Sequence, residues 1–410
     1  MMKKFFCVLC LLYLTKGNPE LKLVHVIFNH KSYAPFSDVS GENGRSLPRN
    51  LSYEYFQSFA IDMPNQGKLN MYNLGVHLRE VYDKFLGEIY TNDIMKMRTS
   101  ENALSMIAGQ LVNAGLWQPK GEQKWNKEMN WQPTPADYVV RKKDTLLLGM
   151  HCPSFIAERN KILSTKEVQN TLLLYLPLFE TISRYTKTKV RHPSDVALLY
   201  SSLETKADLN QTLPYWASDI FPYGAMYNLT LLEYDLLTYT PLQRQLNGGT
   251  MLKEIIINCL KYVQNVMPSG RKIMLYSGDE RNIAGILKSL DLWSPHIPNE
   301  AASVIFELYY DNNTEIYSMK VKYYTGIDRE TISLKLPNCT EICSLKSMIN
   351  MYFDAIPERE EVLCSWKALS VTDNEIPSVA AEENHATTCK SQHIIILLLF
   401  MLIWSSYEDF

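Results

Sequence analysis

Two apolar segments far apart in the sequence each run into a polar loop, and this feature most restricts the fold. Residues 23–28 read LVHVIF and lead into Asn29-His30, while residues 271–278 read RKIMLYSG and lead into Asp279-Glu280. Buried strands of this kind are typical of parallel sheets, in which ligands bind beyond the carboxyl ends of the strands. If the two strands are parallel neighbours, their loops meet in one crevice. The sequence therefore predicts an α/β fold with a site at this edge of the sheet.

The loop after the second segment also has a purely structural interpretation. Asp279 and Glu280 stand just before residues 283–290, where a helix is expected. Carboxylates are favoured at the start of a helix, because they accept hydrogen bonds from its first N–H groups and complement its dipole. On spacing alone, helix capping is the favoured explanation of these two residues.

Apolar periodicity predicts the remaining elements. A short strand is expected at 93–97, and after residues 98–101 a helix is expected to run through Leu111, with Thr99 or Ser100 as its cap. The other expected helices and strands are helices at 71–86 and 251–264 and a hairpin of 302–310 with 315–324. Strands separated by helices imply a central, mainly parallel sheet flanked by helices on both faces, in the α/β class.

The chain divides into several expected regions. The first 17 residues have the charged, apolar and small-residue parts of a secretory signal. An eleven-residue apolar run at 394–404 is too short for a membrane-spanning helix, which needs about 20 residues. A secreted protein with a loose tail is expected, and membrane association through that tail is the less favoured alternative. The expected regions are a signal peptide at 1–17, a main domain at 18–375, and a polar linker with the apolar tail at 376–410. Within the main domain we expect an α/β core at about 18–124 and 246–370 and a mainly helical insertion at about 125–245.

Composition and modification sites agree with export. The formal net charge of −3 gives no reason to expect a nucleic-acid partner. Cysteines beyond the signal are expected to pair in part in an oxidising compartment, and their spacing argues against zinc. We expect no metal and no cofactor. The sequence also contains five acceptor sites for N-glycosylation, which are Asn50, Asn210, Asn228, Asn312 and Asn338.

Several longer motifs identify a family. The chain resembles the histidine acid phosphatases, in particular the secreted and venom-type acid phosphatases of insects, over roughly residues 21–370. The resemblance implies a phosphoglycerate mutase-like fold and a phosphate ester as ligand, and relatives of this kind are often homodimers. The motifs that carry it are YNLGVHLR at 72–79, GLWQP at 115–119, GEQKW at 121–125, WQP at 131–133, LPYWA at 213–217 and YSG at 276–278.

The resemblance assigns site roles residue by residue. The family's signature Arg-His-Gly-x-Arg-x-Pro reads Asn29-His30-Lys31-Ser32-Tyr33-Ala34-Pro35 here. His30 therefore takes the nucleophile position, and Asn29 and Tyr33 replace arginines that bind phosphate. Ungapped matching puts Leu104 at the third such arginine.

The second motif departs from the family as well. The family's Tyr-Ser-x-His-Asp becomes Tyr-Ser-Gly-Asp279-Glu280, so Asp279 replaces a histidine and Glu280 takes the general-acid position. Lys31 and Arg281 are new cations beside the site, and they could compensate in part for the lost arginines.

These replacements should weaken catalysis through the phosphate clamp. In such enzymes a neutral histidine attacks phosphorus while arginines neutralise the phosphoryl oxygens. Loss of one preorganised donor typically costs about 10²–10³ in rate. Because such effects are not fully additive, a total loss of roughly six orders of magnitude is expected.

Three interpretations remain open. The first is a pseudophosphatase that binds a small ligand in the altered crevice or a partner on its surface. The second is an active phosphatase using His30 as nucleophile and Glu280 as general acid, and a positive crevice would favour it over a neutral or negative one. The third is a secreted protein retained for its stable fold alone. His25, inside the first strand, is expected to be a core or interface residue with satisfied hydrogen bonds.

The resemblance also implies two disulfide bonds. They would join Cys152 to Cys364 and Cys339 to Cys343, tying the helical insertion to the C-terminal region. The partners of Cys259 and Cys389 are not assigned by it.

Overall fold

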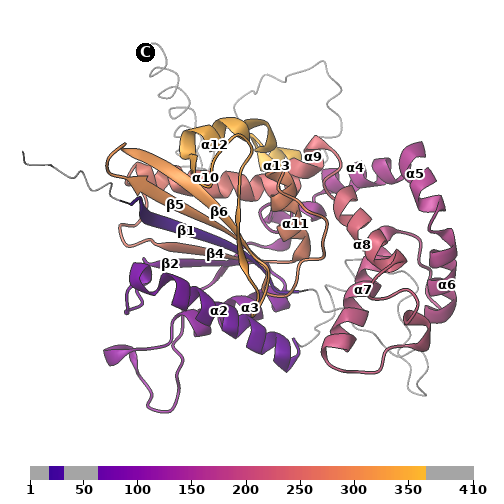
Figure 1. The fold of residues 1–410 in the computed structure, drawn as a ribbon, viewed down its shortest axis with the longest axis horizontal. Coiled ribbons are helices and arrows are strands. Elements are labelled where there is room, and N and C mark those ends of the chain that lie inside the picture. Colours follow the sequence, from indigo (N-terminus) through magenta and orange to yellow (C-terminus); the bar gives the residue numbers. More distant parts are fainter. Residues whose placement is uncertain (1–17, 32–62, 366–410) are drawn as a thin grey trace, which may run out of the picture. The chain divides into compact units, whose positions relative to one another are not determined.

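A mixed β-sheet forms the centre of the computed structural model, which describes residues 18–31 and 63–365 (Figure 1). Within these residues the sheet has eight strands in the order β3-β2-β4-β1-β5-β6-β7, with β8 paired to β6. The strands are β1 Glu20–Asn29, β2 Met95–Thr99, β3 Asp137–Tyr138, β4 Ile273–Gly278, β5 Ser303–Asp311, β6 Ile316–Tyr324, β7 Thr331–Leu334 and β8 Cys343–Ser344.

The α/β class and the predicted hairpin are confirmed, but the sheet is mixed rather than mainly parallel. Strands β3, β2, β4 and β1 pair in parallel, whereas β5, β6, β7 and β8 pair antiparallel. The short turn between β5 and β6 forces those two strands to run in opposite directions. The parallel half alone brings several strand ends to one edge, and the two segments singled out in the sequence both lie in it.

Helices cover both faces of the sheet (Figure 1). Because successive side chains of a strand point to opposite faces, Val24 and Val26 pack with one layer and Leu23 and Ile27 with the other. The first layer contains α2 Asn65–Leu86 and α3 Ala103–Leu116. The second contains α10 Thr250–Val263, α11 Glu280–Ser289 and α12 Leu345–Met351.

The cap of α3 differs from the prediction. Asn102, rather than Thr99 or Ser100, accepts a hydrogen bond from Leu104 N at 2.9 Å. Thr99 still belongs to strand β2, and the Ser100 hydroxyl accepts instead from Asn102 N at 3.3 Å. The strand therefore extends two residues beyond the predicted end, which moves the helix start along the chain.

A second group of helices is built around its own buried apolar cluster, which includes Ile182, Val196, Leu203 and Leu229. These helices lie within the segment predicted as a helical insertion; its status as a domain stays a prediction. They are α4 Pro153–Leu163, α5 Lys166–Leu173, α6 Leu176–Thr186, α7 Pro193–Asp208 and α8 Ala225–Leu236. The short helix α9 Pro241–Arg244 follows, and its Leu242 packs against a separate small cluster. The short remaining elements are α13 Glu360–Leu363, the π-helix η5 Gln245–Gly249 and the 3₁₀ helices η1 Gly121–Gln123, η2 Arg141–Lys143, η3 Gly149–His151, η4 Tyr215–Ala217 and η6 Phe353–Ala355.

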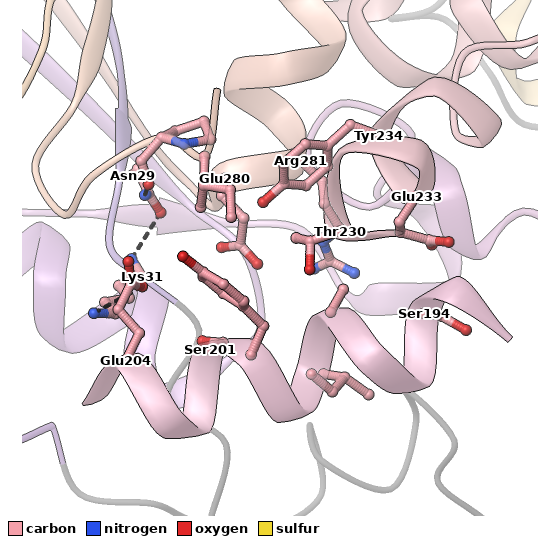
Figure 2. Close-up of a pocket in the computed structure, with 15 residues that line it drawn as sticks. Asn29, Lys31, Ser194, Ser201, Glu204, Thr230, Glu233, Tyr234, Glu280 and Arg281 are labelled. Atoms are coloured by element: carbon pink, nitrogen blue, oxygen red, sulfur yellow. Dashed lines mark hydrogen bonds and ion pairs between the residues drawn. The ribbon is translucent and has the colours of Figure 1, made fainter. Parts of the chain in front are cut away.

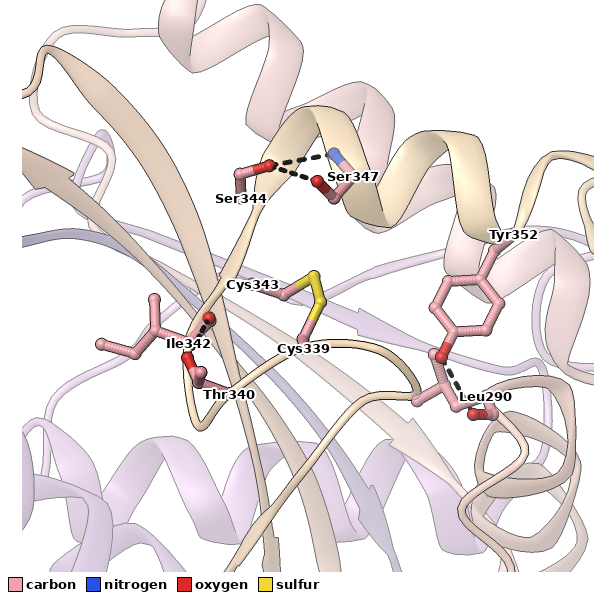
Figure 3. The surroundings of a disulfide bond; sticks show 8 residues. All are labelled: Leu290, Cys339, Thr340, Ile342, Cys343, Ser344, Ser347 and Tyr352. Atoms are coloured by element: carbon pink, nitrogen blue, oxygen red, sulfur yellow. Dashed lines mark hydrogen bonds between the residues drawn. A yellow bond between two sulfur atoms is a disulfide. The ribbon is translucent and has the colours of Figure 1, made fainter.

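Two disulfide bonds have the pairing that the resemblance implies. Cys152, at the start of α4, is bonded to Cys364, at the end of α13. Cys339 is bonded to Cys343 beside α12 (Figure 3). Cys259 is a buried free thiol, and Cys389 lies outside the described residues.

Some further predictions concern residues outside the described ranges, namely the signal at 1–17, Tyr33, Asn50 and the tail at 376–410. The four other glycosylation asparagines, Asn210, Asn228, Asn312 and Asn338, are exposed, as an acceptor site requires. Modification of these sites stays a prediction. No helix in the described part of the chain combines the length and apolar character that crossing a bilayer requires.

Candidate functional site

The two polar loops singled out in the sequence meet in space. Strands β1 and β4 are parallel neighbours, with Asn29 opposite Gly278. The His30 N–H donates to Gly278 O at 3.0 Å, so pairing continues to the last residues of both strands. The predicted convergence of these loops at the carboxyl edge is confirmed.

His30 lies buried at this edge, with 5% of its surface exposed. Its Nδ1 is 3.0 Å from Lys31 O. Burial lowers the pKa of His30 to about 4, because the hydrogen bond to the Lys31 carbonyl, which raises it, is outweighed by desolvation and by the positive charge of Arg281. The imidazole is therefore neutral over most of the physiological range, as a nucleophile requires.

Asn29 is fully used in holding the loop. Its amide nitrogen donates to Pro298 O at 3.2 Å and to Asn299 O at 2.8 Å. Its amide oxygen accepts from Lys31 N at 2.8 Å. Since both donor hydrogens point at backbone carbonyls, Asn29, for which the resemblance implies an arginine, has no donor left for a phosphate.

Lys31 is held by two carboxylates of α7. Its Nζ lies 2.6 Å from Asp208 Oδ2 and 3.1 Å from Glu204 Oε2. Burial lowers the pKa of Lys31, but the two carboxylates outweigh that effect and the pKa is raised overall. The backbone of Lys31 is left-handed, with φ of 58°. The resemblance implies glycine at this position, and glycine is the residue that adopts this conformation without strain.

Asp279 caps helix α11, so the structural interpretation of this residue is confirmed. Its carboxylate accepts from the backbone N–H of Arg281 at 3.0 Å and of Asn282 at 3.3 Å. The same carboxylate forms an ion pair with the Arg281 guanidinium. Burial raises the pKa of the Asp279 carboxyl and lowers that of Arg281 to about 9.

Beside these residues lies a small pocket with a cavity volume of about 50 Å³, room for a few water molecules (Figure 2). Its charged lining consists of two cations, Lys31 and Arg281, and three acids, Glu204, Glu233 and Glu280. Glu280 therefore lies in the pocket, whereas His30 is not among the lining residues. The rest of the lining is Asn29, Ser194, Ala197, Leu198, Tyr200, Ser201, Thr230, Tyr234, Ile297 and Pro298.

The helical segment contributes residues that the sequence analysis did not find. Tyr200, Glu204 and Asp208 are four residues apart on α7, and this spacing puts them on one face of the helix. Helix α8 adds Glu233, which is paired with Arg159 at 2.7 Å. The spacing on α7 was visible in the sequence, but nothing local indicated that this face would lie against the end of β1.

Leu104 does not line the pocket. It is buried in the apolar layer formed by α2 and α3, so the residue that the resemblance matches to a third arginine is part of the core. Nearby, Ser105 and Ser277 hold α3 to the end of β4 through reciprocal hydrogen bonds of 2.8 and 2.9 Å. Arg98, on β2, is buried and paired with Asp144 at 2.8 Å. Among the described residues no group of three or more metal-ligating side chains is present.

Comparison with known proteins matches residues 60–324 to the model of the histidine phosphatase superfamily, branch 2. The chain is 32% identical to venom acid phosphatase Acph-1 of Apis mellifera, over 87% of this chain and 91% of that one. It is 26% identical to human prostatic acid phosphatase, over 84% and 88% of the two chains. Its fold resembles that of Hafnia alvei phytase in complex with tartrate, with a TM-score of 0.60 at 15% identity, covering 85% of this chain and 98% of that one.

Proposed function

Since the chain belongs to the histidine acid phosphatases, in branch 2 of the histidine phosphatase superfamily, we propose that it is an acid phosphatase-like protein with impaired catalysis. Its pocket would serve to bind a ligand rather than to hydrolyse phosphate monoesters efficiently. The family relationship by itself leaves the efficiency of catalysis open, so the proposal depends on the charges at the site.

One observation carries the proposal: each of the two new cations at the pocket already has a carboxylate partner. Lys31 is paired with Glu204 and Asp208, and Arg281 with Asp279. A clamp for a phosphoryl dianion needs positive charge that is not already neutralised, in a fixed bidentate geometry. The lining as a whole carries three acids against two cations, so its formal charge does not attract a dianion.

An alternative is weak residual hydrolysis, and two features of the site favour it. His30 is neutral above about pH 4, so it is in the protonation state that attacks phosphorus. Glu280 lies in the pocket, where a general acid would be needed. These residues supply a nucleophile and a proton, but they do not stabilise the charge that develops on the phosphoryl oxygens.

Phosphate binding tests the proposal without relying on turnover. Titration of the purified protein with inorganic phosphate, followed by calorimetry, should show no saturable binding at concentrations up to about 1 mM, the range in which the binding free energy is near −4 kcal/mol. Saturable binding in the micromolar range, lost in Arg281→Met, would mean that Arg281 leaves Asp279 to bind the anion, and the proposal would fail.

Export is the second part of the proposal. The two disulfide bonds suit an oxidising compartment, and the exposed asparagines suit glycosylation there. Expression in insect cells should therefore give a protein that is found in the medium and whose apparent molecular mass falls on treatment with an N-glycosidase. Retention of an unglycosylated protein inside the cells would contradict this.

A further inference from the structure

Helix α8 places a buried tyrosine in the pocket beside the acids. Tyr234 is 4% exposed and lines the pocket. Figure 2 shows Tyr234 and Glu280 projecting into the same space from different helices. Burial raises the pKa of Tyr234, and Glu280 and Glu204 raise it further, so the phenol stays protonated. A phenol hydroxyl can both donate and accept a hydrogen bond, so Tyr234 can serve a polar group of a ligand in this pocket.

A row of aromatic rings leads from the pocket to the surface. Tyr200 lines the pocket, and its ring lies 6.2 Å from that of Tyr227. The Tyr227 ring in turn lies 5.9 Å from that of Tyr223, which is 79% exposed. Rings at such separations offer faces on which an apolar or aromatic group can pack, and those faces also attract cations.

The pocket lining carries charges of both signs, but its acids outnumber its cations by three to two. Lys31 neutralises one of the two α7 carboxylates near it, Glu204 and Asp208, which leaves an excess negative charge. Glu280 adds another acid to the lining. Negative charge, a polar hydroxyl and aromatic faces together are the features by which proteins recognise organic ammonium ions.

We propose that the pocket binds a small organic ammonium ion with an aromatic body. The ammonium group would lie between Glu280, Glu204 and the Tyr234 hydroxyl, which can accept one of its hydrogens. The enclosed volume of about 50 Å³ suits such a head group, and the aromatic body would extend over Tyr227 and Tyr223. This inference rests on the proposed function, because a working phosphatase would hold a dianion in the same place.

Calorimetric titration of the full secreted protein with phenethylamine tests this inference. Its neutral counterpart 2-phenylethanol has the same ring and chain without the charge, and glucose represents a neutral hydroxylated ligand. We expect saturable binding of the amine with one site per chain, and binding of the alcohol at least about tenfold weaker, since an ion pair that is largely desolvated is worth more than about 1.4 kcal/mol.

Two variants localise the site. Glu280→Gln should weaken amine binding at least about tenfold, and Tyr234→Phe should weaken it several-fold while keeping the ring. Glu341→Gln removes the same charge from an exposed residue outside the pocket and should leave binding unchanged. Thermal unfolding of each variant shows whether it is folded.

The outcomes separate the two proposals. A folded protein that hydrolyses no phosphate ester and binds no amine would overturn the ammonium site and leave the impaired phosphatase intact. Equal binding of amine and alcohol, or binding of glucose alone, would also overturn the ammonium site. Efficient hydrolysis of a phosphate ester would overturn the proposed function, whatever the amine does.

Discussion

The ammonium group of Lys31 lies 2.6 Å from the carboxylate of Asp208, across the gap between the end of β1 and helix α7. From the sequence alone, Lys31 was a candidate for phosphate binding, but its charge is engaged by this carboxylate. It also fixes the loop after β1 to the helical segment. One substitution relative to the family pattern, glycine to lysine, thus changes both the charge and the attachment of the site.

The backbone of Lys31 gives a first prediction. Lys31→Gly should be more stable than Lys31→Ala by about 1 kcal/mol, because both lose the ion pairs but only glycine relieves the left-handed conformation at φ 58°. The lost ion pairs should cost about 1 kcal/mol or less in either variant, since Asp208 is largely exposed. Urea unfolding of the two variants measures the difference, and equal stability would show that the residue is not left-handed in solution.

The buried pair of Asp279 and Arg281 gives a second prediction. Asp279→Asn keeps a capping side chain but leaves the buried guanidinium without its carboxylate, so it should cost about 3–5 kcal/mol. Adding Arg281→Met should recover part of that loss, because a buried positive charge that has lost the Asp279 carboxylate is removed. Chemical unfolding of both variants checks this order. A double variant less stable than Asp279→Asn would show that Arg281 is held mainly by other groups.

His25 corrects one expectation and gives a third prediction. It is fully buried, as predicted, but neither ring nitrogen has a hydrogen-bond partner among the described residues. Its ring stacks on Tyr276 at a centroid distance of 6.3 Å. Burial lowers the pKa of His25 to about 3, so protonation favours the unfolded chain. The stability contributed by the neutral imidazole is complete above about pH 6.5 and is lost as the pH falls toward 3.

His25→Leu should therefore lose less stability in acid than the wild type. Between about pH 6.5 and 4 the difference in unfolding free energy between the two should change by up to about 1.4 kcal/mol per pH unit. Thermal or urea unfolding at several pH values measures it. The difference in unfolding free energy between the two proteins at neutral pH reports the change in packing, and it serves as the internal control. Parallel stability profiles would mean that His25 keeps an ordinary pKa in the native state.

The disulfide between Cys152 and Cys364 gives a fourth prediction. It closes a loop across 212 residues, and the Ser154 hydroxyl donates to Leu363 O beside it. Cys152→Ala with Cys364→Ala should lower the unfolding free energy by about 2–5 kcal/mol, mainly because the unfolded chain is less constrained. The pair Cys339→Ala and Cys343→Ala is the matched control, since it closes a loop of only four residues and should cost less. The reverse order would contradict the loop-length argument.

Local patterns predicted the strands and helices well where a single periodicity dominates. The strand at 23–28, the helix at 71–86 and the hairpin of 302–310 with 315–324 lie within one to several residues of β1, α2, β5 and β6. The antiparallel pairing of β5 with β1 was missed, because the direction of β5 depends on which strand it joins, and neither segment alone indicates that contact.

Only the part of the site that is formed at the ends of the sheet strands was predictable from the sequence. Asn29 and Glu280 follow strand ends and were found, but Glu204 and Tyr234 come from helices whose position over the site depends on tertiary packing. The pairing of Lys31 with Asp208 joins residues 177 positions apart. No local sequence pattern indicates a contact between residues so far apart. This ion pair nevertheless decides whether Lys31 can bind phosphate.

Hydrolysis of a generic aryl phosphate, measured from about pH 4 to 8 for the wild type beside His30→Ala, distinguishes an impaired phosphatase from a working one. We expect the folded wild type and the variant to hydrolyse the ester at the same rate, lower than that of an intact relative by roughly six orders of magnitude. If the wild type turns the ester over efficiently and His30→Ala does not, then His30 still attacks phosphorus, the pocket neutralises the phosphoryl group, and the claim of an impaired phosphatase is wrong.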